Sequence, residues 1–236
     1  IRSGMADAML AGGAEATICS VAVAAFDRLG AMSRRNEDYS MTPQPFDKNR
    51  DGLVMGEGSA VLVLEHLQSA RARGANILAE MAGYGATSDA FHITAPHETG
   101  AGGATAMRQA LHAAELAITA VDYINAHGTA TPLNDAAETR AIKTVFGEHA
   151  HKIAVSSTKS MTGHMMGATG SLEALFCVQA ISARLAPPTI HYQTPDPECD
   201  LDYVPNASRE MPINVAISNS FGFGGHNSVL AFKNYT

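Results

Sequence analysis

A lysine and a histidine lie five residues apart in the stretch VSSTKSMTGHMMGATGS, residues 155–171, among almost only small side chains. Small residues let the backbone approach a ligand or another element closely. Lys159 precedes a segment that is predicted to be a buried helix, where an unpaired charge is costly. Glu173, on that helix, is therefore its expected partner. The alternative is a lysine whose charge reaches solvent and a His164 that only caps the loop, and this stretch alone does not decide between them.

A second histidine lies in the stretch NAHGTATPLND, residues 125–135. Thr131 and Pro132 have the pattern of a helix N-cap followed by proline at the first helical position. Asp135 and Glu138 then fall near the positive end of the helix dipole. His127 is thus predicted between a strand and a helix, where open α/β sheets bind ligands. A single histidine at such a position is nevertheless more often structural.

The third stretch is NSFGFGGHN, residues 219–227, which contains three glycines and two phenylalanines. Glycines free the backbone for unusual torsions and let amides point at a ligand, and an aromatic ring between them can move as a lid. A tight hairpin between two strands is the alternative.

Alternating strands and helices are predicted to position these loops. Buried strands are predicted in residues 7–17, 59–67 and 77–86, further strands in 121–128, 152–160 and 213–233, and helices in 102–116, 135–146 and 168–183. Near-continuous apolar strands indicate a sheet covered on both faces, which predicts helix, sheet and helix layers. Lys159 is expected at the end of a strand. Residues 187–205, which contain Cys199, are expected to cross the surface.

Composition excludes several classes of protein. With 236 residues and 46% hydrophobic content, the chain can form a packed core as one large domain or two small ones. The net charge of -7 argues against a nucleic-acid partner and against adsorption to anionic membranes, and no apolar run is long enough to span a bilayer. Cys19, Cys177 and Cys199 have no metal-binding spacing, so no metal site or disulfide is predicted and a reducing compartment is expected.

Together, in this order and at this separation, the three loops closely resemble the signature loops of the elongating β-ketoacyl-acyl-carrier-protein synthases. The resemblance continues through MLAGGAEA, FDKNRDGLVMGEGSAVLVLE, SDAFHITAP and PPTIHYQTPDPECDLDYVP, and thus covers the chain from near Ile1 to its end. It implies an α/β fold of the thiolase-like superfamily, layered α/β/α/β/α. Residues 1–75 are then expected to end the N-terminal half, and residues 76–236 to form the complete C-terminal half.

The resemblance implies a condensing acyltransferase of type II fatty acid synthesis. Such enzymes perform a decarboxylative Claisen condensation of an acyl thioester with malonyl-acyl-carrier protein. The family's nucleophilic cysteine is expected before Ile1, so the chain is expected to be an inactive C-terminal fragment. The implied partners are acyl carrier protein and, in the full-length form, a second copy. No cofactor is implied beyond the phosphopantetheine that carries the substrates, and the cytoplasm, or an organelle if a transit peptide precedes Ile1, is the expected compartment.

By match of motif, His127 and His164 would donate to the malonyl thioester oxyanion. Lys159, held by Glu173, would organise the site, and the Phe223 amide would help form a second oxyanion hole while its ring gates the pocket. The substrate-binding candidates are Thr129, Thr131, His92, Thr94 and Phe221, and Asp135 is a supporting residue. Within the glycine-rich motif, His226 occupies a place often held by threonine and is expected to affect packing behind the loop.

Related classes differ at these motifs. Histidine at both positions favours an elongating synthase over an initiating one, which pairs its cysteine with one histidine and one asparagine. The absence of cysteine from GFGGHN argues against a thiolase. The remaining alternative is a non-catalytic chain-length-determining subunit, or a polyketide ketosynthase subunit, of the same fold.

Overall fold

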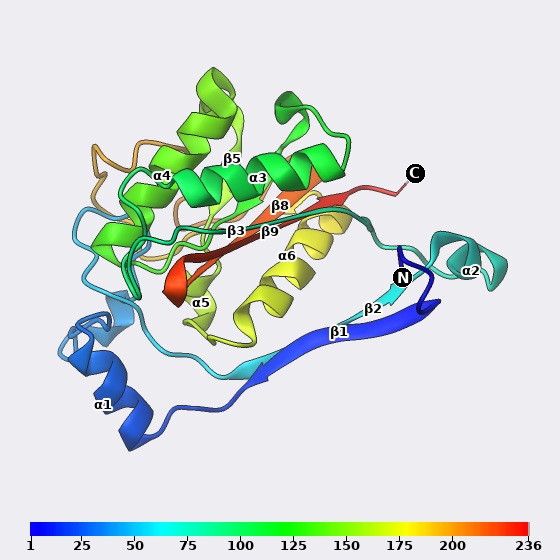
Figure 1. Ribbon diagram of the computed structural model, residues 1–236. Coiled ribbons are helices and arrows are strands. Elements are labelled where there is room, and N and C mark those ends of the chain that lie inside the picture. Colours follow the sequence, from blue (N-terminus) through cyan, green and yellow to red (C-terminus); the bar gives the residue numbers. More distant parts are fainter. Residues whose placement is uncertain (236) are drawn as a thin grey trace.

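The computed structural model describes residues 1–235 and shows a five-stranded sheet and a two-stranded sheet separated by a helix (Figure 1), and two further short strands pair with each other. The strands are β1 (Ala8–Glu15), β2 (Gly58–Glu65), β3 (Glu80–Ser88), β4 (Tyr123–Asn125), β5 (Ala154–Ser156), β6 (Leu185–Ala186), β7 (Arg209–Glu210), β8 (Val215–Gly222) and β9 (His226–Lys233). The α-helices are α1 (Ser20–Arg28), α2 (Leu67–Ala72), α3 (Ala101–Ala113), α4 (Pro132–Phe146), α5 (Lys159–Thr162) and α6 (Thr169–Ala183). Short 3-10 turns are η1 (Tyr39–Met41), η2 (Ile118–Ala120), η3 (Gly147–Lys152) and η4 (Phe223–Gly225).

The larger sheet has five strands in the order β3-β9-β8-β4-β5. The β3–β9 and β9–β8 pairs are antiparallel, whereas β8–β4 and β4–β5 are parallel. The parallel strands β4 and β5 are fully buried, as their apolar sequences predict. Their carboxyl ends lead directly into the two stretches that contain His127 and Lys159, which brings these stretches to one edge of the sheet.

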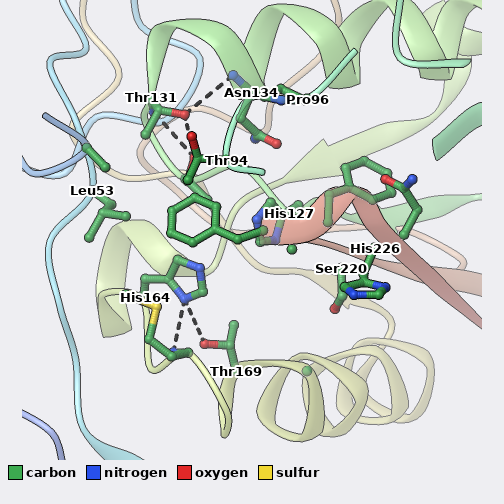
Figure 2. Close-up of a pocket in the computed structure, with 18 of the residues that line it drawn as sticks. Leu53, Thr94, Pro96, His127, Thr131, Asn134, His164, Thr169, Ser220 and His226 are labelled. Carbon is green, nitrogen blue, oxygen red and sulfur yellow. Dashed lines mark hydrogen bonds between the residues drawn. The ribbon is translucent and has the colours of Figure 1, made fainter. Parts of the chain in front are cut away.

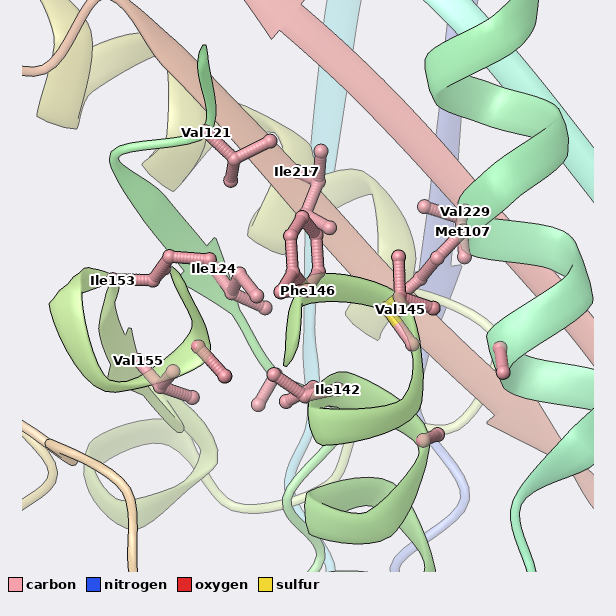
Figure 3. Packing of buried hydrophobic residues seen from close by; sticks show 14 of the residues in the cluster. Met107, Val121, Ile124, Ile142, Val145, Phe146, Ile153, Val155, Ile217 and Val229 are labelled. Carbon is pink, nitrogen blue, oxygen red and sulfur yellow. The ribbon is translucent and has the colours of Figure 1, made fainter. Parts of the chain in front are cut away.

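Helices cover both faces of this sheet. Figure 1 shows α3 and α4 over one face and α6 under the other, with β1 and β2 beyond α6. Each of α3 and α4 buries an apolar face, and these faces pack with β4, β5 and β8 around Ile124, Ile142, Phe146 and Ile217 (Figure 3). The α6 helix lies between the two sheets, as expected for a largely buried helix. The layered α/β prediction is therefore confirmed.

The antiparallel β1–β2 pair differs from the prediction of buried strands. Leu10, Val61 and Val63 expose 71%, 58% and 67% of their surface, and no residue of α1 is buried. The reason is that α6 covers only one face of this pair, while nothing in residues 1–235 covers the other. Residues 73–79 link this part to the five-stranded sheet, and the division of the chain at residue 75 remains a prediction.

Two other expectations about local structure are wrong. Strand β5 ends at Ser156, so Lys159 begins the short helix α5 instead of ending a strand. The stretch 187–205 does not simply cross the surface, because Cys199, Leu201 and Tyr203 belong to the main core. In the described part of the chain, no helix is long and apolar enough to cross a membrane.

Candidate active site

The backbone at His127 is held by a buried carboxylate. Glu138, on α4, accepts hydrogen bonds from the N–H groups of His127 and Gly128, each over 2.8 Å, and from the Asn219 side chain over 3.0 Å. Burial raises the pKa of Glu138, and these donors oppose that change. The sequence indicated only that Glu138 lies near a helix start, so its role as an acceptor for the histidine loop was missed.

The start of α4 has the predicted cap. Thr131 is the N-cap, its hydroxyl accepts from the Asn134 amide over 3.4 Å, and Pro132 follows at the first turn. The hydroxyl of Thr131 also lies 2.9 Å from that of Thr129. The pair of threonines is thereby held at one side of the histidine loop.

Asp135 supports a neighbouring segment of the chain. Its buried carboxylate accepts from the Phe46 amide over 2.8 Å and lies 3.9 Å from the Arg50 guanidinium. Burial raises the pKa of Asp135 to about 6, although the hydrogen bonds and Arg50 oppose the shift. Asp135 therefore joins residues 46–50 to α4 and does not line the cavity described below.

Lys159 and Glu173 form the expected ion pair. Their charged atoms are 2.5 Å apart, and both residues expose only 1% of their surface. Burial raises the pKa of Glu173 to about 7, against the effect of the Lys159 ammonium. The positive charge of Lys159 acts on both histidines, but neither member of the pair lines the cavity.

His164 has a defined tautomer when it is neutral. Its Nδ1 accepts from the Met166 backbone N–H over 3.1 Å and lies 3.2 Å from the Thr169 hydroxyl. A neutral imidazole carries one proton, so this proton must be on Nε2. Burial and Lys159 lower the pKa of His164 to about 3. Near neutral pH the ring is therefore an uncharged N–H donor.

The His127 ring lies edge-on to His164, with 5.4 Å between the ring centroids and 85° between the planes. Burial, the charge of Lys159 and the proximity of His164 lower the pKa of His127 well below its ordinary value. Its Nδ1 is buried and has no hydrogen-bond partner within residues 1–235. Two neutral imidazoles thus lie side by side, and each carries one N–H group that can donate a hydrogen bond.

Both histidines line a cavity of about 420 Å³ (Figure 2). Of the other candidates from the sequence, Thr94, Thr129, Thr131, Phe221 and Phe223 also line it. His92 does not, because its Nδ1 accepts the backbone N–H groups of Thr94 and Ala95, each over 3.1 Å, and so shapes the loop that carries Thr94. The structure therefore brings together three loops that are far apart in the sequence.

The glycine-rich loop joins β8 to β9 at the mouth of the cavity. Gly224 has a φ of 79°, which favours glycine, and its amide donates to the Ile93 carbonyl over 2.7 Å. The Phe223 ring is 47% exposed and stacks on Phe26 of α1, with 6.2 Å between centroids. Phe223 thus lines the cavity with an exposed side chain, and its role as a gate remains a prediction.

His226, the first residue of β9, is exposed and lines the cavity. Its ring also lies against the glycine-rich loop, since a Cβ on Gly224 would come within 3.1 Å of it. The expected effect of His226 on the packing of the loop remains a prediction. Other lining residues that sequence reasoning missed are Phe26, Leu53, Asn134 and Ser220. Phe26 lies outside the quoted stretches, whereas Leu53, Asn134 and Ser220 lie within them but were not singled out by their residue types, and only the fold brings all four to the histidines.

None of the three cysteines lines the cavity. Cys19 is exposed at the start of α1, whereas Cys177 and Cys199 are buried. Burial raises the pKa of both thiols, that of Cys199 to about 12, which disfavours the reactive thiolate. Cys199 was expected in a surface loop, and its burial is a correction. Among the described residues, no group of histidine, cysteine and carboxylate side chains could hold a metal ion.

Known proteins match the chain over its whole length. Residues 1–70 match the model of the β-ketoacyl synthase N-terminal domain, and residues 78–193 match that of the C-terminal domain. Two curated relatives are named 3-oxoacyl-acyl-carrier-protein synthase 2. The one from Synechocystis sp. is 56% identical and the one from Staphylococcus aureus is 54% identical, each over all of this chain and 56% of the relative.

Solved structures with lower sequence identity have closely similar folds. A β-ketoacyl synthase from Burkholderia phymatum has a TM-score of 0.94 and 44% identity, over all of this chain and 56% of that one. A type II polyketide ketosynthase, solved with its acyl carrier protein and bound to a hexaketide, has a TM-score of 0.98 and 43% identity, over all of this chain and 58% of that one. The chain belongs to the β-ketoacyl synthase family. It spans a little over half the length of the curated relatives that it matches.

Proposed function

We propose that this chain provides the malonyl-activating part of a synthase that condenses an acyl thioester with malonyl-acyl-carrier protein by loss of carbon dioxide. The observation that carries the proposal is the pair of buried, neutral imidazoles of His127 and His164, 5.4 Å apart in one cavity. Both curated relatives are named as synthases of 3-oxoacyl-acyl-carrier protein, which is the product of this condensation, and their names support the proposal. The enzyme is then an acyltransferase of fatty acid biosynthesis.

The reaction begins with acyl loading. A thiol sulfur of the protein bonds to the acyl carbon, the bond to the pantetheine sulfur breaks, and a proton passes from the first thiol to the second. No cysteine of residues 1–235 lines the cavity, so this thiol would come from residues outside this segment. The Phe223 amide is our candidate donor to the acyl carbonyl oxygen during this step.

Decarboxylation then uses the two histidines. The bond from the malonyl carboxylate to its methylene breaks, carbon dioxide leaves, and the electron pair forms an enolate whose negative oxygen accepts from both imidazole N–H groups. The methylene carbon attacks the acyl carbonyl, and the protein thiolate leaves. Each neutral ring keeps one N–H group that can donate to this oxygen. Lys159, held by Glu173, keeps the rings neutral and orders the site.

Carrier protein is the proposed partner, and the complex of the polyketide ketosynthase with its carrier supports this. Thr129 and Thr131, which line the cavity beside the histidines, would bind the pantetheine arm, and Thr94 would contact it from its own loop. We propose no other cofactor. We also propose that the full-length protein forms a homodimer and is located in the cytoplasm.

The proposal is tested with the complete protein that contains this segment. His127→Ala and His164→Ala should still permit acyl loading, which mass spectrometry detects, while release of labelled carbon dioxide from malonyl-carrier protein falls about 100-fold or more. The exposed His151 provides a matched His→Ala control. Release at the unaltered rate by both cavity variants would contradict the assignment.

A polyketide ketosynthase is the second candidate, because a protein of that kind has the same fold over the whole chain. The two candidates share the histidine chemistry and differ in the acyl group that they extend. A non-catalytic chain-length subunit is disfavoured, since it would have no use for two neutral donors beside a buried lysine. Measured carbon dioxide release separates this last alternative from both catalytic ones.

A further inference from the structure

His164 is held in place by the first part of the chain. Its backbone N–H donates to the Val54 carbonyl over 2.7 Å, and its carbonyl accepts the N–H of Gly56 over 3.0 Å. A Cβ on Gly56 would lie 2.4 Å from the Thr162 carbonyl oxygen, so a side chain there would displace this segment. The backbone of His127, by contrast, is held by a carboxylate on α4. The two rings of the pair are therefore positioned by different parts of the chain.

The turn after His164 decides which ring nitrogen carries the proton. Met166 donates its backbone N–H to Nδ1 of His164 over 3.1 Å. The φ of Met166 is 37°, in the left-handed region, which costs energy for a residue with a side chain unless its surroundings hold it. Ala168 donates to the Met165 carbonyl over 2.8 Å and closes the turn. The direction of the Met166 N–H therefore depends on the groups that hold residues 165–168.

Glu15, the last residue of β1, holds this turn from the other sheet. Its Oε2 accepts the N–H of Gly167 over 3.1 Å, and its Oε1 accepts the Thr17 hydroxyl over 2.6 Å. These hydrogen bonds lower the pKa of Glu15, so its carboxylate is ionised at neutral pH. The strand itself lies close to the turn, since a Cβ on Gly13 would come within 2.4 Å of the Gly167 carbonyl oxygen. Glu15 does not line the cavity, so it acts on His164 only through this turn.

We propose that Glu15 is a positioning residue for His164: by holding the Gly167 amide it keeps the turn in place, and so keeps the proton of the neutral ring on Nε2. Without an acceptor for the Gly167 N–H, Met166 can relax to a negative φ and turn its own N–H away from Nδ1. The ring then populates both tautomers, and only one of them has an N–H group at Nε2. The effect on catalysis rests on the proposed function, whereas the effect on the tautomer does not.

The complete protein with ¹⁵N-labelled histidine tests this role. At neutral pH, the NMR shifts of the two ring nitrogens report which one carries the proton, and His164→Gln identifies the signals of His164. Glu15→Leu should move both shifts toward a mixture of tautomers. It should also lower kcat of malonyl decarboxylation about five-fold, the equivalent of one hydrogen bond, with KM little changed. Glu15→Gln, whose side-chain oxygen still accepts the Gly167 N–H, should retain the shifts and most of the activity.

Glu57→Leu is the matched control, because the Glu57 carboxylate also accepts a backbone N–H, that of Ile18, but forms no hydrogen bond with residues 164–168. If Glu15→Leu does not fold, Glu15→Asp, which draws the carboxylate back by one methylene, gives the same comparison. Unchanged ring shifts in the Glu15 variant, or equal changes in the control, would overturn the inference. Changed shifts in a protein that releases no carbon dioxide even when unaltered would instead contradict the proposed function and leave the effect on the tautomer standing.

Discussion

The carboxylate of Glu138 accepts the backbone N–H of His127 over 2.8 Å, inside the protein and eleven positions further along the chain. The same carboxylate also accepts the N–H of Gly128. The catalytic candidate is therefore positioned through its backbone by a residue on α4, and the loop after β4 cannot shift without breaking buried hydrogen bonds.

Glu138→Gln should loosen this loop. The side-chain amide would direct an N–H group at one backbone N–H, so a buried donor is left unpaired at a cost of about 1–3 kcal/mol. We expect a lower unfolding midpoint and a fall of about ten-fold in malonyl decarboxylation at saturating substrate. The exposed Glu148→Gln is the matched control. A stable variant with unchanged decarboxylation would show that Glu138 does not position His127.

The buried Lys159–Glu173 pair predicts that removing one charge destabilises the protein more than removing both. Glu173→Leu leaves the Lys159 ammonium buried without its partner, which should lower the free energy of unfolding by about 3–5 kcal/mol. Adding Lys159→Met should recover a large part of that loss, because no unpaired charge then remains. Urea unfolding of both single variants and the double variant measures the coupling. Additive losses would contradict a direct charge pair.

The neutral histidines predict loss of stability in acid. The pKa of His164 is about 3 in the folded protein and about 6.5 when the group is unperturbed. The unfolded chain therefore binds the extra proton first, and the contribution of His164 to stability is present above pH 6.5 and lost as the pH falls toward 3. His164→Gln should reduce this slope by up to about 1.4 kcal/mol per pH unit.

Urea unfolding at several pH values measures this slope, with His151→Gln as the control at an exposed site. Equal slopes for His164→Gln and the control would mean that His164 gains its proton as readily in the folded protein as in the unfolded chain.

Phe223→Ala should disturb the order in which acyl and malonyl groups enter. The substitution keeps the backbone amide but removes the ring that stacks on Phe26 at the cavity mouth. We expect altered rates of acyl loading and condensation in single-turnover measurements. The control is Phe91→Ala, an exposed aromatic that does not line the cavity. Unchanged rates with acyl groups of every length tested would remove the gate from the mechanism.

The exposed face of β1–β2 predicts self-association of the 236-residue chain on its own. Leu10, Val61 and Val63 form an apolar surface on neighbouring strands, and such surfaces promote aggregation. Size-exclusion chromatography should show oligomers, and Val61→Lys with Val63→Lys should reduce them. We also expect no acyl adduct and no condensation from this chain. A stoichiometric adduct on Cys19, Cys177 or Cys199 with product formation would show that the nucleophile lies within it.

Local chemistry allowed the sequence alone to predict much of this molecule. The N-cap at Thr131, the apolar faces of α3 and α4 and the buried helix α6 all follow from residue types within one turn or one element. The two histidines and the glycine-rich loop were likewise recognised as three motifs. Their order along the chain was sufficient to identify the family.

Only the tertiary structure decided how distant residues meet. The contact of Glu138 with the His127 loop, the burial of Cys199 and the presence of His226 in the cavity wall depend on how α4, residues 187–205 and the β8–β9 hairpin pack together. Exposure of β1 and β2 depends on which faces their neighbours cover. Periodicity reports that a side chain is apolar or polar, but burial and pKa are set by the surrounding elements, which a linear pattern does not contain.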